Sequence, residues 1–314
     1  MAQWFSAARR AIAGIAGIAL IATSLWTGPA SAKDPFRTSN ERDISDRTEA
    51  AFRALFEQGD YKKAAELLQK VESNSDPLAY GMQASLAFVK GDKTAFKQYA
   101  DKTLAAAQEL AKSDSLRGNI YLAAGHFLQG GYAVLTDGTV KGAPEALSRL
   151  QQVYDHLDAA EAEAPNDPEL SLVKGYMDLM VSVVLPFSSP NEAIEQLQNN
   201  AYPVYLVDRG LAVAYRDMKK HSKALDAVNR ALAATPDNPD LLYLKAQILV
   251  NQGNRPAALP LFQKAIEKED QLPNRLTAQI DYEHCKARES VEKIDLPCQS
   301  RRKAIRRGEL RASQ

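Results

Sequence analysis

Apolar residues recur three and four positions apart along most of the chain beyond residue 45, which is the spacing of one face of an α-helix. The pattern is most regular in two blocks, 205–238 and 239–272, which align without a gap at a spacing of 34 residues. An internal repeat of this length, with one turn in its middle and another at its end, predicts a stack of helix pairs. The matched positions are small or apolar in both blocks: Ala212 and Ala246, Tyr215 and Leu249, Ala224 and Ala258, Leu225 and Leu259, Val228 and Phe262, Ala231 and Ala265, and Leu232 and Ile266.

Residues that end helices mark the turns between the predicted helices. The sequence Pro236-Asp237-Asn238-Pro239 separates the two blocks, because proline lacks the amide that would continue a helix and the Asp-Asn pair favours a turn. Gly253-Asn254 marks the turn inside the second block, where the first block has Lys219-Lys220. The repeated alanines are expected where two helices cross closely, since a larger side chain would force the helices apart.

Weaker copies of the pattern extend the array towards the N-terminus, so we expect about six helix pairs in residues 45–298. The third pair is irregular: residues 130–142 are expected to form a long loop, the place where a small β-hairpin would fit best. An apolar insertion, 184–189, lengthens the turn of the fourth pair. A final amphipathic helix that starts near Pro273 is expected to cap the array, whose last face would otherwise lack a neighbour.

A 34-residue period with alanine at the eighth, twentieth and twenty-seventh places and proline at the thirty-second resembles the tetratricopeptide repeat. In the block 205–238 these places hold Ala212, Ala224, Ala231 and Pro236. The resemblance implies an all-α fold, a tetratricopeptide-like α-solenoid of antiparallel helix pairs with a C-terminal capping helix. A family of binding scaffolds also implies that the protein is not an enzyme and needs no cofactor.

Three further segments are similar to a group of exported tetratricopeptide proteins from cyanobacteria. They are Gly175–Leu179, Leu185–Pro190 and Tyr205–Gly210, and the ending Tyr282–Cys285 also suits that group. The similarity covers roughly residues 165–298. It implies a location in the cell envelope, either the periplasm or, in a cyanobacterium, the thylakoid lumen.

The family resemblance also implies a binding surface for a protein or peptide partner. In tetratricopeptide repeats, places two, five, nine, twelve and thirteen of the first helix line the concave face. The Lys and Asn that some members use to bind chaperone tails are absent, so a carboxylate-tail ligand is not implied. The alternative for each position is an ordinary hydrated helix face. In the two regular blocks these places hold Leu206, Arg209, Val213, Arg216, Asp217, Asp240, Tyr243, Gln247, Val250 and Asn251.

The first 32 residues have the order of a secretory signal peptide. Arg9 and Arg10 precede an apolar run of some 16 residues, and Ala30-Ser31-Ala32 offers a cleavage site. The run is shorter than the roughly 20 residues that a membrane span requires, so a retained anchor is the weaker interpretation. We expect cleavage after Ala32, followed by a flexible segment at 33–44.

The chain has only two cysteines, Cys285 and Cys298. In an exported protein a disulfide between them is the first expectation, because oxidising compartments favour disulfides. The alternatives are two free thiols or a metal site, although two thiols and the neighbouring His284 fall short of four zinc ligands.

The charge distribution argues against nucleic acid as a partner and shows a basic C-terminal segment. The first 32 residues hold two of the 39 basic and none of the 39 acidic residues, so the remainder carries a net charge of −2. A general nucleic-acid binder needs a basic surface, so no nucleic acid is expected. Residues 299–314 are nevertheless a basic tail, which could dock on an anionic membrane surface or an acidic partner, or could be a solvated, frayed helix end. Its cations are Arg301, Arg302, Lys303, Arg306, Arg307 and Arg311.

The sequence contains no recognisable catalytic motif. The four histidines are scattered, without metal-ligand spacing, and His126 is expected to be a core residue. The leading hypothesis is therefore a non-enzymatic scaffold that binds a protein or peptide on its concave surface. The rival is a structural assembly module attached through its basic tail to a membrane or envelope complex, and an exported hydrolase is a weaker third hypothesis.

Overall fold

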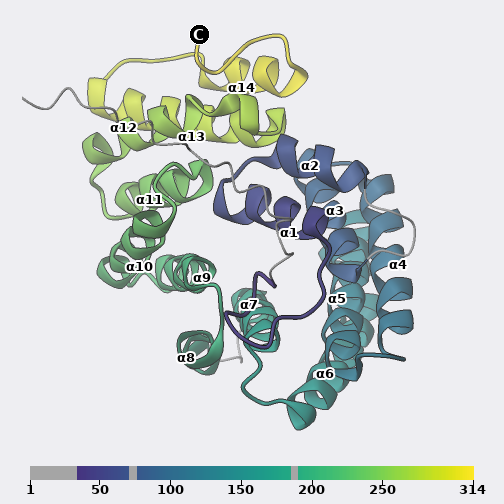
Figure 1. Ribbon diagram of the computed structural model, residues 1–314. Helices are drawn as coiled ribbons and strands as arrows, with labels where there is room; N and C mark the ends of the chain where they lie inside the picture. The colour runs from purple at the N-terminus through teal and green to yellow at the C-terminus, as the bar shows by residue number, and fades with distance from the viewer. Residues whose placement is uncertain (1–33, 71–75, 185–189) are drawn as a thin grey trace, which may run out of the picture. The chain divides into compact units, whose positions relative to one another are not determined.

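The computed structural model describes residues 34–70, 76–184 and 190–314, which all belong to one compact unit, Ala32–Gln314. Within these residues the regular structure is entirely helical, with fourteen α-helices and no strand, which confirms the all-α solenoid (Figure 1). The expected signal peptide, 1–32, and most of the insertion at 184–189 lie outside the described residues. No helix of the described part has both the length and the apolar character needed to cross a bilayer.

Successive helices form pairs joined by short turns, as the repeat pattern predicts. The described residues form seven pairs when the C-terminal one is included, whereas about six pairs and a capping helix were expected. The pairs are α1 (Asp46–Phe52, continued as a π-helical turn, Arg53–Glu57) with α2 (Tyr61–Gln69), α3 (Pro77–Lys90) with α4 (Lys93–Leu110), α5 (Ser115–Lys141) with α6 (Ala143–Glu163), α7 (Pro168–Val184) with α8 (Pro190–Asn200), α9 (Val204–Asp217) with α10 (His221–Ala234), α11 (Pro239–Asn251) with α12 (Arg255–Ile266), and α13 (Asn274–Glu292) with α14 (Cys298–Arg307).

The two regular repeats have the register that the sequence predicts. The six matched alanines of α9 to α12 are all fully buried, because the helices of each pair approach closely at these positions. The turn between α11 and α12 lies at the predicted helix-breaking residue, Gly253. Its φ is +84°, in the left-handed region that glycine adopts without strain. The six buried alanines are Ala212, Ala224, Ala231, Ala246, Ala258 and Ala265.

The prediction of a long loop at residues 130–142, the place where a small hairpin would fit best, is wrong. The segment continues α5 as far as Lys141, with one non-helical residue, Gly138, near its end. Two of its glycines lie at close approaches: a Cβ on Gly130 would lie 3.3 Å from Cβ of Arg149 on α6, and one on Gly142 would lie 2.5 Å from the carbonyl oxygen of Ala133. A Cβ on Gly131 or Gly138 would have no atom within 4 Å. A glycine-rich stretch therefore extends the α5–α6 pair beyond the ordinary repeat length.

The N-terminal segment, 34–44, contacts the repeats through buried residues at both of its ends, Asp34–Phe36 and Ile44. Phe36 is 2% exposed, and its ring lies 5.1 Å from the ring of Phe52 on α1. The guanidinium of Arg37 forms ion pairs with Asp34, with Asp167 and, at 3.3 Å, with Glu169, which is itself fully buried. The ring of Phe36 and the ion pairs of Arg37 hold this segment on the repeats. Its sequence has no helical periodicity from which these contacts could be predicted.

The basic tail is also folded, so the domain boundary expected at residue 298 falls at the start of a helix. α14 packs against α13, and Ile305 and Ala312 are 3% and 7% exposed. Arg311 reaches back to Glu269 at 2.6 Å, while the amide of Ala312 donates to the same carboxylate at 2.7 Å. The C-terminal cap is consequently a helix pair, α13 and α14, rather than one helix with a free tail.

Candidate functional site

Four of the predicted concave-face residues meet the C-terminal cap in an open cleft of about 620 Å³. Arg216 comes from the end of α9, and Gln247, Val250 and Asn251 come from α11. The opposite wall is α13, which a sequence argument restricted to repeat positions did not include. The remaining lining residues are Arg255, Phe262, Tyr282, Glu283, Lys286, Ala287 and Ser290.

A network of hydrogen bonds centred on Glu283 fixes the polar side of this cleft. The carboxylate of Glu283 accepts from the hydroxyl of Tyr243 at 2.7 Å and from the amide of Gln247 at 3.0 Å. Gln247 in turn accepts from Arg216 at 2.9 Å. Burial and the charge of Glu283 both raise the pKa of Tyr243, so its hydroxyl remains a donor at neutral pH. The cap helix therefore orders the side chains that the last repeat presents.

The charge of the cleft rim is mainly positive. Arg216, Arg255 and Lys286 line it, against the single carboxylate of Glu283, whose oxygens already accept hydrogen bonds. Arg216 is partly neutralised by Asp217 at 2.8 Å, and Lys286 by Glu289. A partner with acidic or hydrogen-bond-accepting groups would fit this rim better than a basic one.

Three other predicted concave-face residues are covered by the chain itself. Leu206 is 4% exposed, and its carbonyl accepts from the hydroxyl of Tyr176 on α7 at 2.7 Å. Asp240 accepts from Tyr61 on α2 at 2.6 Å. Arg209 is half-buried; burial alone would lower its pKa, but Tyr176, Asp240 and Tyr61 raise it, so its charge has partners inside the protein. Leu206, Arg209 and Asp240 therefore hold the fold together and are not a free surface.

The covering element is the N-terminal helix pair. The side-chain amide of Asn238 donates to the backbone carbonyls of Phe56 and Glu57, each at 3.1 Å, across about 180 residues of sequence. Gly59 lies so close to Pro239 that a Cβ on the glycine would come within 2.7 Å of the proline ring. No repeat pattern predicts these contacts, because they join residues from opposite ends of the array. Of the last two concave-face residues, Asp217 is exposed and Val213 is half-buried against the core.

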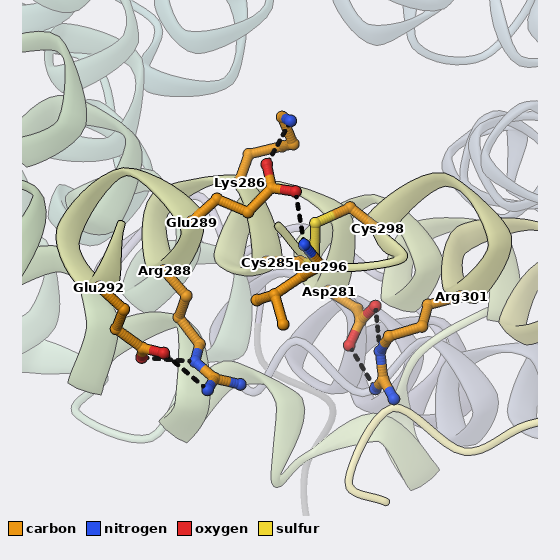
Figure 2. Close-up of a disulfide and its surroundings, with 9 residues drawn as sticks. All are labelled: Asp281, Cys285, Lys286, Arg288, Glu289, Glu292, Leu296, Cys298 and Arg301. Atoms are coloured by element: carbon orange, nitrogen blue, oxygen red, sulfur yellow. Dashed lines mark hydrogen bonds and ion pairs between the residues drawn. A yellow bond between two sulfur atoms is a disulfide. The ribbon is translucent and has the colours of Figure 1, made fainter. Parts of the chain in front are cut away.

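The predicted disulfide between Cys285 and Cys298 is present and joins α13 to the start of α14, with 5.6 Å between the Cα atoms (Figure 2). The figure shows the contacts that flank it: Arg301 pairs with Asp281 at 2.9 Å, and the amide of Leu296 donates to Glu289 at 3.0 Å. Within the described residues no group of His, Cys, Asp and Glu has the arrangement of a metal site.

The predicted basic surface of the tail is reduced by contacts within the cap. Arg301 is paired with Asp281, and Arg302 donates to Gln279 at 2.6 Å while its guanidinium lies 4.9 Å from the ring centre of Tyr282. Arg307 pairs with Glu309 at 2.7 Å, and only Lys303 and Arg306 are exposed without such a partner. Docking of the tail on a membrane or acidic partner stays a prediction that would depend on these last cations.

His126 is buried, as predicted, and it lies against a second histidine. It is 8% exposed, and its ring stacks on His156 of α6 with 5.6 Å between centroids and 6° between planes. Burial, His156 and Arg149 lower the pKa of His126 to about 4, so the ring is neutral at physiological pH. Two imidazoles that stack face to face do not converge on one metal ion, so the pair is structural.

Comparison with known proteins agrees with the helical repeats seen in the structure. A family model described as tetratricopeptide repeat matches residues 49–111 and 209–274. Tetratricopeptide repeat protein 7A from Homo sapiens is 31% identical over 137 residues, which cover 40% of this chain and only 15% of the human protein. The 34-residue spacing, the helix pairs and these similarities show tetratricopeptide repeats in two regions of the chain, residues 49–111 and 209–274.

Proposed function

We propose that the protein is a non-enzymatic scaffold that binds a protein or peptide segment in the cleft between α11 and α13. The observation that carries the proposal is the convergence of Arg216, Gln247, Val250 and Asn251 with the cap helix in one cleft of about 620 Å³. Repeat proteins of this kind bind partners on extended surfaces that several helices build together. Because α2 and α7 contact Leu206, Arg209 and Asp240, the C-terminal end of the array is the part left open to a partner.

The chemistry of the cleft favours a segment with acidic groups beside apolar side chains. Val250 supplies apolar surface above the buried Phe262 and Ala287, while Arg216 and Arg255 supply charge-assisted donors. The hydrogen bonds around Glu283 hold the donors in place before binding, which lowers the entropy lost when a partner is bound.

The binding site can be tested with a random-peptide display library selected on protein that comprises residues 33–314. Asn251→Trp places a large ring in the cleft mouth, whereas Gln252→Trp alters the next exposed residue, which does not line the cleft. We expect selected peptides to bind Asn251→Trp at least about tenfold more weakly, a difference of about 1.4 kcal/mol, and to bind Gln252→Trp normally. Equal binding to both variants would place the site elsewhere.

We also propose that the protein acts after export, in the cell envelope. The signal-like order of residues 1–32 and the paired cysteines support this location. N-terminal sequencing of the protein from its native cells tests it. A chain that begins at Lys33 is expected, and a chain that retains Arg9 and Arg10 in a reducing compartment would contradict export.

A further inference from the structure

A second cleft, of about 380 Å³, lies at the junction of the N-terminal repeats with the C-terminal cap. It is separate from the proposed partner cleft and shares no residue with it. Its walls come from the starts of α2 and α13, the end of α3 and the last turn of α14. The lining residues are Tyr61, Lys62, Lys90, Pro273, Asn274, Arg275 and Arg306.

Four of these seven residues are cations, and no carboxylate lines the cleft. Among the described residues, Lys62, Lys90, Arg275 and Arg306 form no ion pair, although most other arginines of the cap do. The four cations are exposed, and they come from four separate helices to one cleft, where they create a positive potential that attracts anions, most strongly at low ionic strength. The imbalance is local, since the chain as a whole has a formal charge of zero.

The backbone adds donors to the same place. α13 is 19 residues long and starts here with Pro273 as its N-cap, without a side-chain hydrogen bond to its first amides. Unpaired amides at a helix start carry partial positive charge and bind anions, phosphate groups above all. Tyr61 contributes an aromatic wall, while its hydroxyl is already committed to Asp240 at 2.6 Å.

Two helix-ending glycines allow the walls to approach. Gly91, at the end of α3, has a φ of +80°, and the guanidinium of Arg275 occupies the space that a side chain there would take. Gly308, after α14, has a φ of +76°, and a Cβ on it would lie 3.1 Å from the side-chain amide of Asn274. Both glycines thus bring α3 and α14 against the start of α13, which gathers the four cations.

We propose that this cleft binds a compact anion with at least two negative charges, of the phosphoryl or pyrophosphoryl class. A single carboxylate would leave most of the four cations unneutralised, whereas phosphate oxygens accept from arginine, lysine and helix amides together. Because the walls belong to both ends of the array, a bound anion also ties the N-terminal repeats to the cap. Binding should therefore stabilise the folded protein, and the free energy of unfolding should rise with the logarithm of the anion concentration once that exceeds Kd.

Titration calorimetry of the disulfide-bonded protein, residues 33–314, with inorganic pyrophosphate tests the proposal at low ionic strength. We expect one site per chain. Lys62→Gln and Arg306→Gln should each weaken binding about fivefold or more, the effect of one charge at roughly 4 Å even in a fully aqueous medium. The matched controls are Lys63→Gln on α2 and Lys303→Gln on α14, exposed cations that do not line the cleft and should bind pyrophosphate as the parent does.

A second arm separates a free anion from a lipid headgroup. Co-sedimentation with phosphatidic-acid vesicles, compared with uncharged vesicles, should depend on Lys62 and Arg306 if the headgroup enters the cleft. Binding of pyrophosphate alone would assign a free anion, and vesicle binding with the same dependence would assign the lipid. If neither probe binds, or if control and cleft variants lose binding equally, the proposal is wrong. Circular dichroism of each variant checks that the fold is retained.

Discussion

At the scale of single residues, two properties specify the repeats: the size of the buried side chains and the sign of the φ angle at the turns. The matched alanines are fully buried, so each marks a place where one more carbon has no room. The turns inside the two regular repeats each have one residue with positive φ: Gly253 has a φ of +84°, whereas Lys219 adopts +59° in the preceding repeat. The same turn is thus made once by glycine and once by a strained lysine, which is why the sequence signal for it is uneven.

Substitution of the turn glycine should therefore cost stability through the backbone alone. No atom lies within 4 Å of a Cβ built on Gly253, so Gly253→Ala creates no clash, only a left-handed alanine. We expect a loss of about 1 kcal/mol in urea unfolding. Lys219→Gly should not destabilise the protein by a comparable amount, because there glycine relieves strain. Equal losses in the two variants would contradict the assignment of strain to Lys219.

A larger side chain at the close helix crossing should lower the free energy of unfolding by more than the turn substitution does. Ala224→Leu and Ala258→Leu occupy equivalent, fully buried positions, and each is expected to destabilise by roughly 1 to 3 kcal/mol. Ala233→Leu, on the exposed face of α10, is the control and should leave the urea midpoint nearly unchanged. A wild-type midpoint for either buried variant would mean that the helices cross elsewhere.

At the scale of helices, periodicity located nearly every element but misjudged the long α5–α6 pair. Glycine-rich sequence at 130–142 predicts a loop because glycine is a poor helix former. Here Gly130 lies where α6 approaches, so at this point tertiary contact outweighs local propensity. The stacked rings of His126 and His156 lie in the same helix pair, with Asn119 bonded to His156 at 2.9 Å and Arg149 facing His126.

The histidine pair should make the α5–α6 packing sensitive to acid. The pKa of His126 falls from 6.5 to about 4 on folding, first through burial and then through His156 and Arg149. A group with a depressed folded pKa stabilises the fold above its unfolded pKa, so this contribution is complete above pH 6.5 and is lost as the pH falls towards 4.

Unfolding titrations at several pH values check this dependence. We expect the parent protein to lose on the order of 2 kcal/mol from this group between pH 6.5 and 4. His126→Gln cannot titrate, so its stability should change less over that interval. A variant with the parent's full pH dependence would show that other groups control acid unfolding.

At the scale of the whole molecule, contacts between distant parts of the sequence decide what the repeat pattern leaves open. Of the positions on α9 and α11 that the pattern predicts to be concave, four line one cleft. It could not show that Leu206, Arg209 and Asp240 are covered, because the bonds of Tyr61 to Asp240 and of Asn238 to Phe56 join opposite ends of the chain. The periodicity also does not predict the contacts of segment 34–44 or the ion-pair partners of Arg301 and Arg311.

The disulfide is the one link between the ends of the cap that the sequence could predict, and its loss tests how far the cap stabilises the array. It joins Cys285 and Cys298 at a sequence separation of 13, and for a loop of this size the chain-entropy model gives about 3 kcal/mol. Alkylation of unreduced protein should label neither thiol, and Cys285→Ala with Cys298→Ala should lower the free energy of unfolding by about that amount.

The same double variant should also affect binding. Because α13 supplies Glu283 to the cleft between α11 and α13 and Arg275 to the cleft lined by four cations, both binding activities should weaken in the double variant near its unfolding midpoint. If labelling shows both thiols free in native protein, or if the double variant unfolds at the parent's urea concentration, the cap is held by the contacts of Arg301, Arg311 and Ile305 alone.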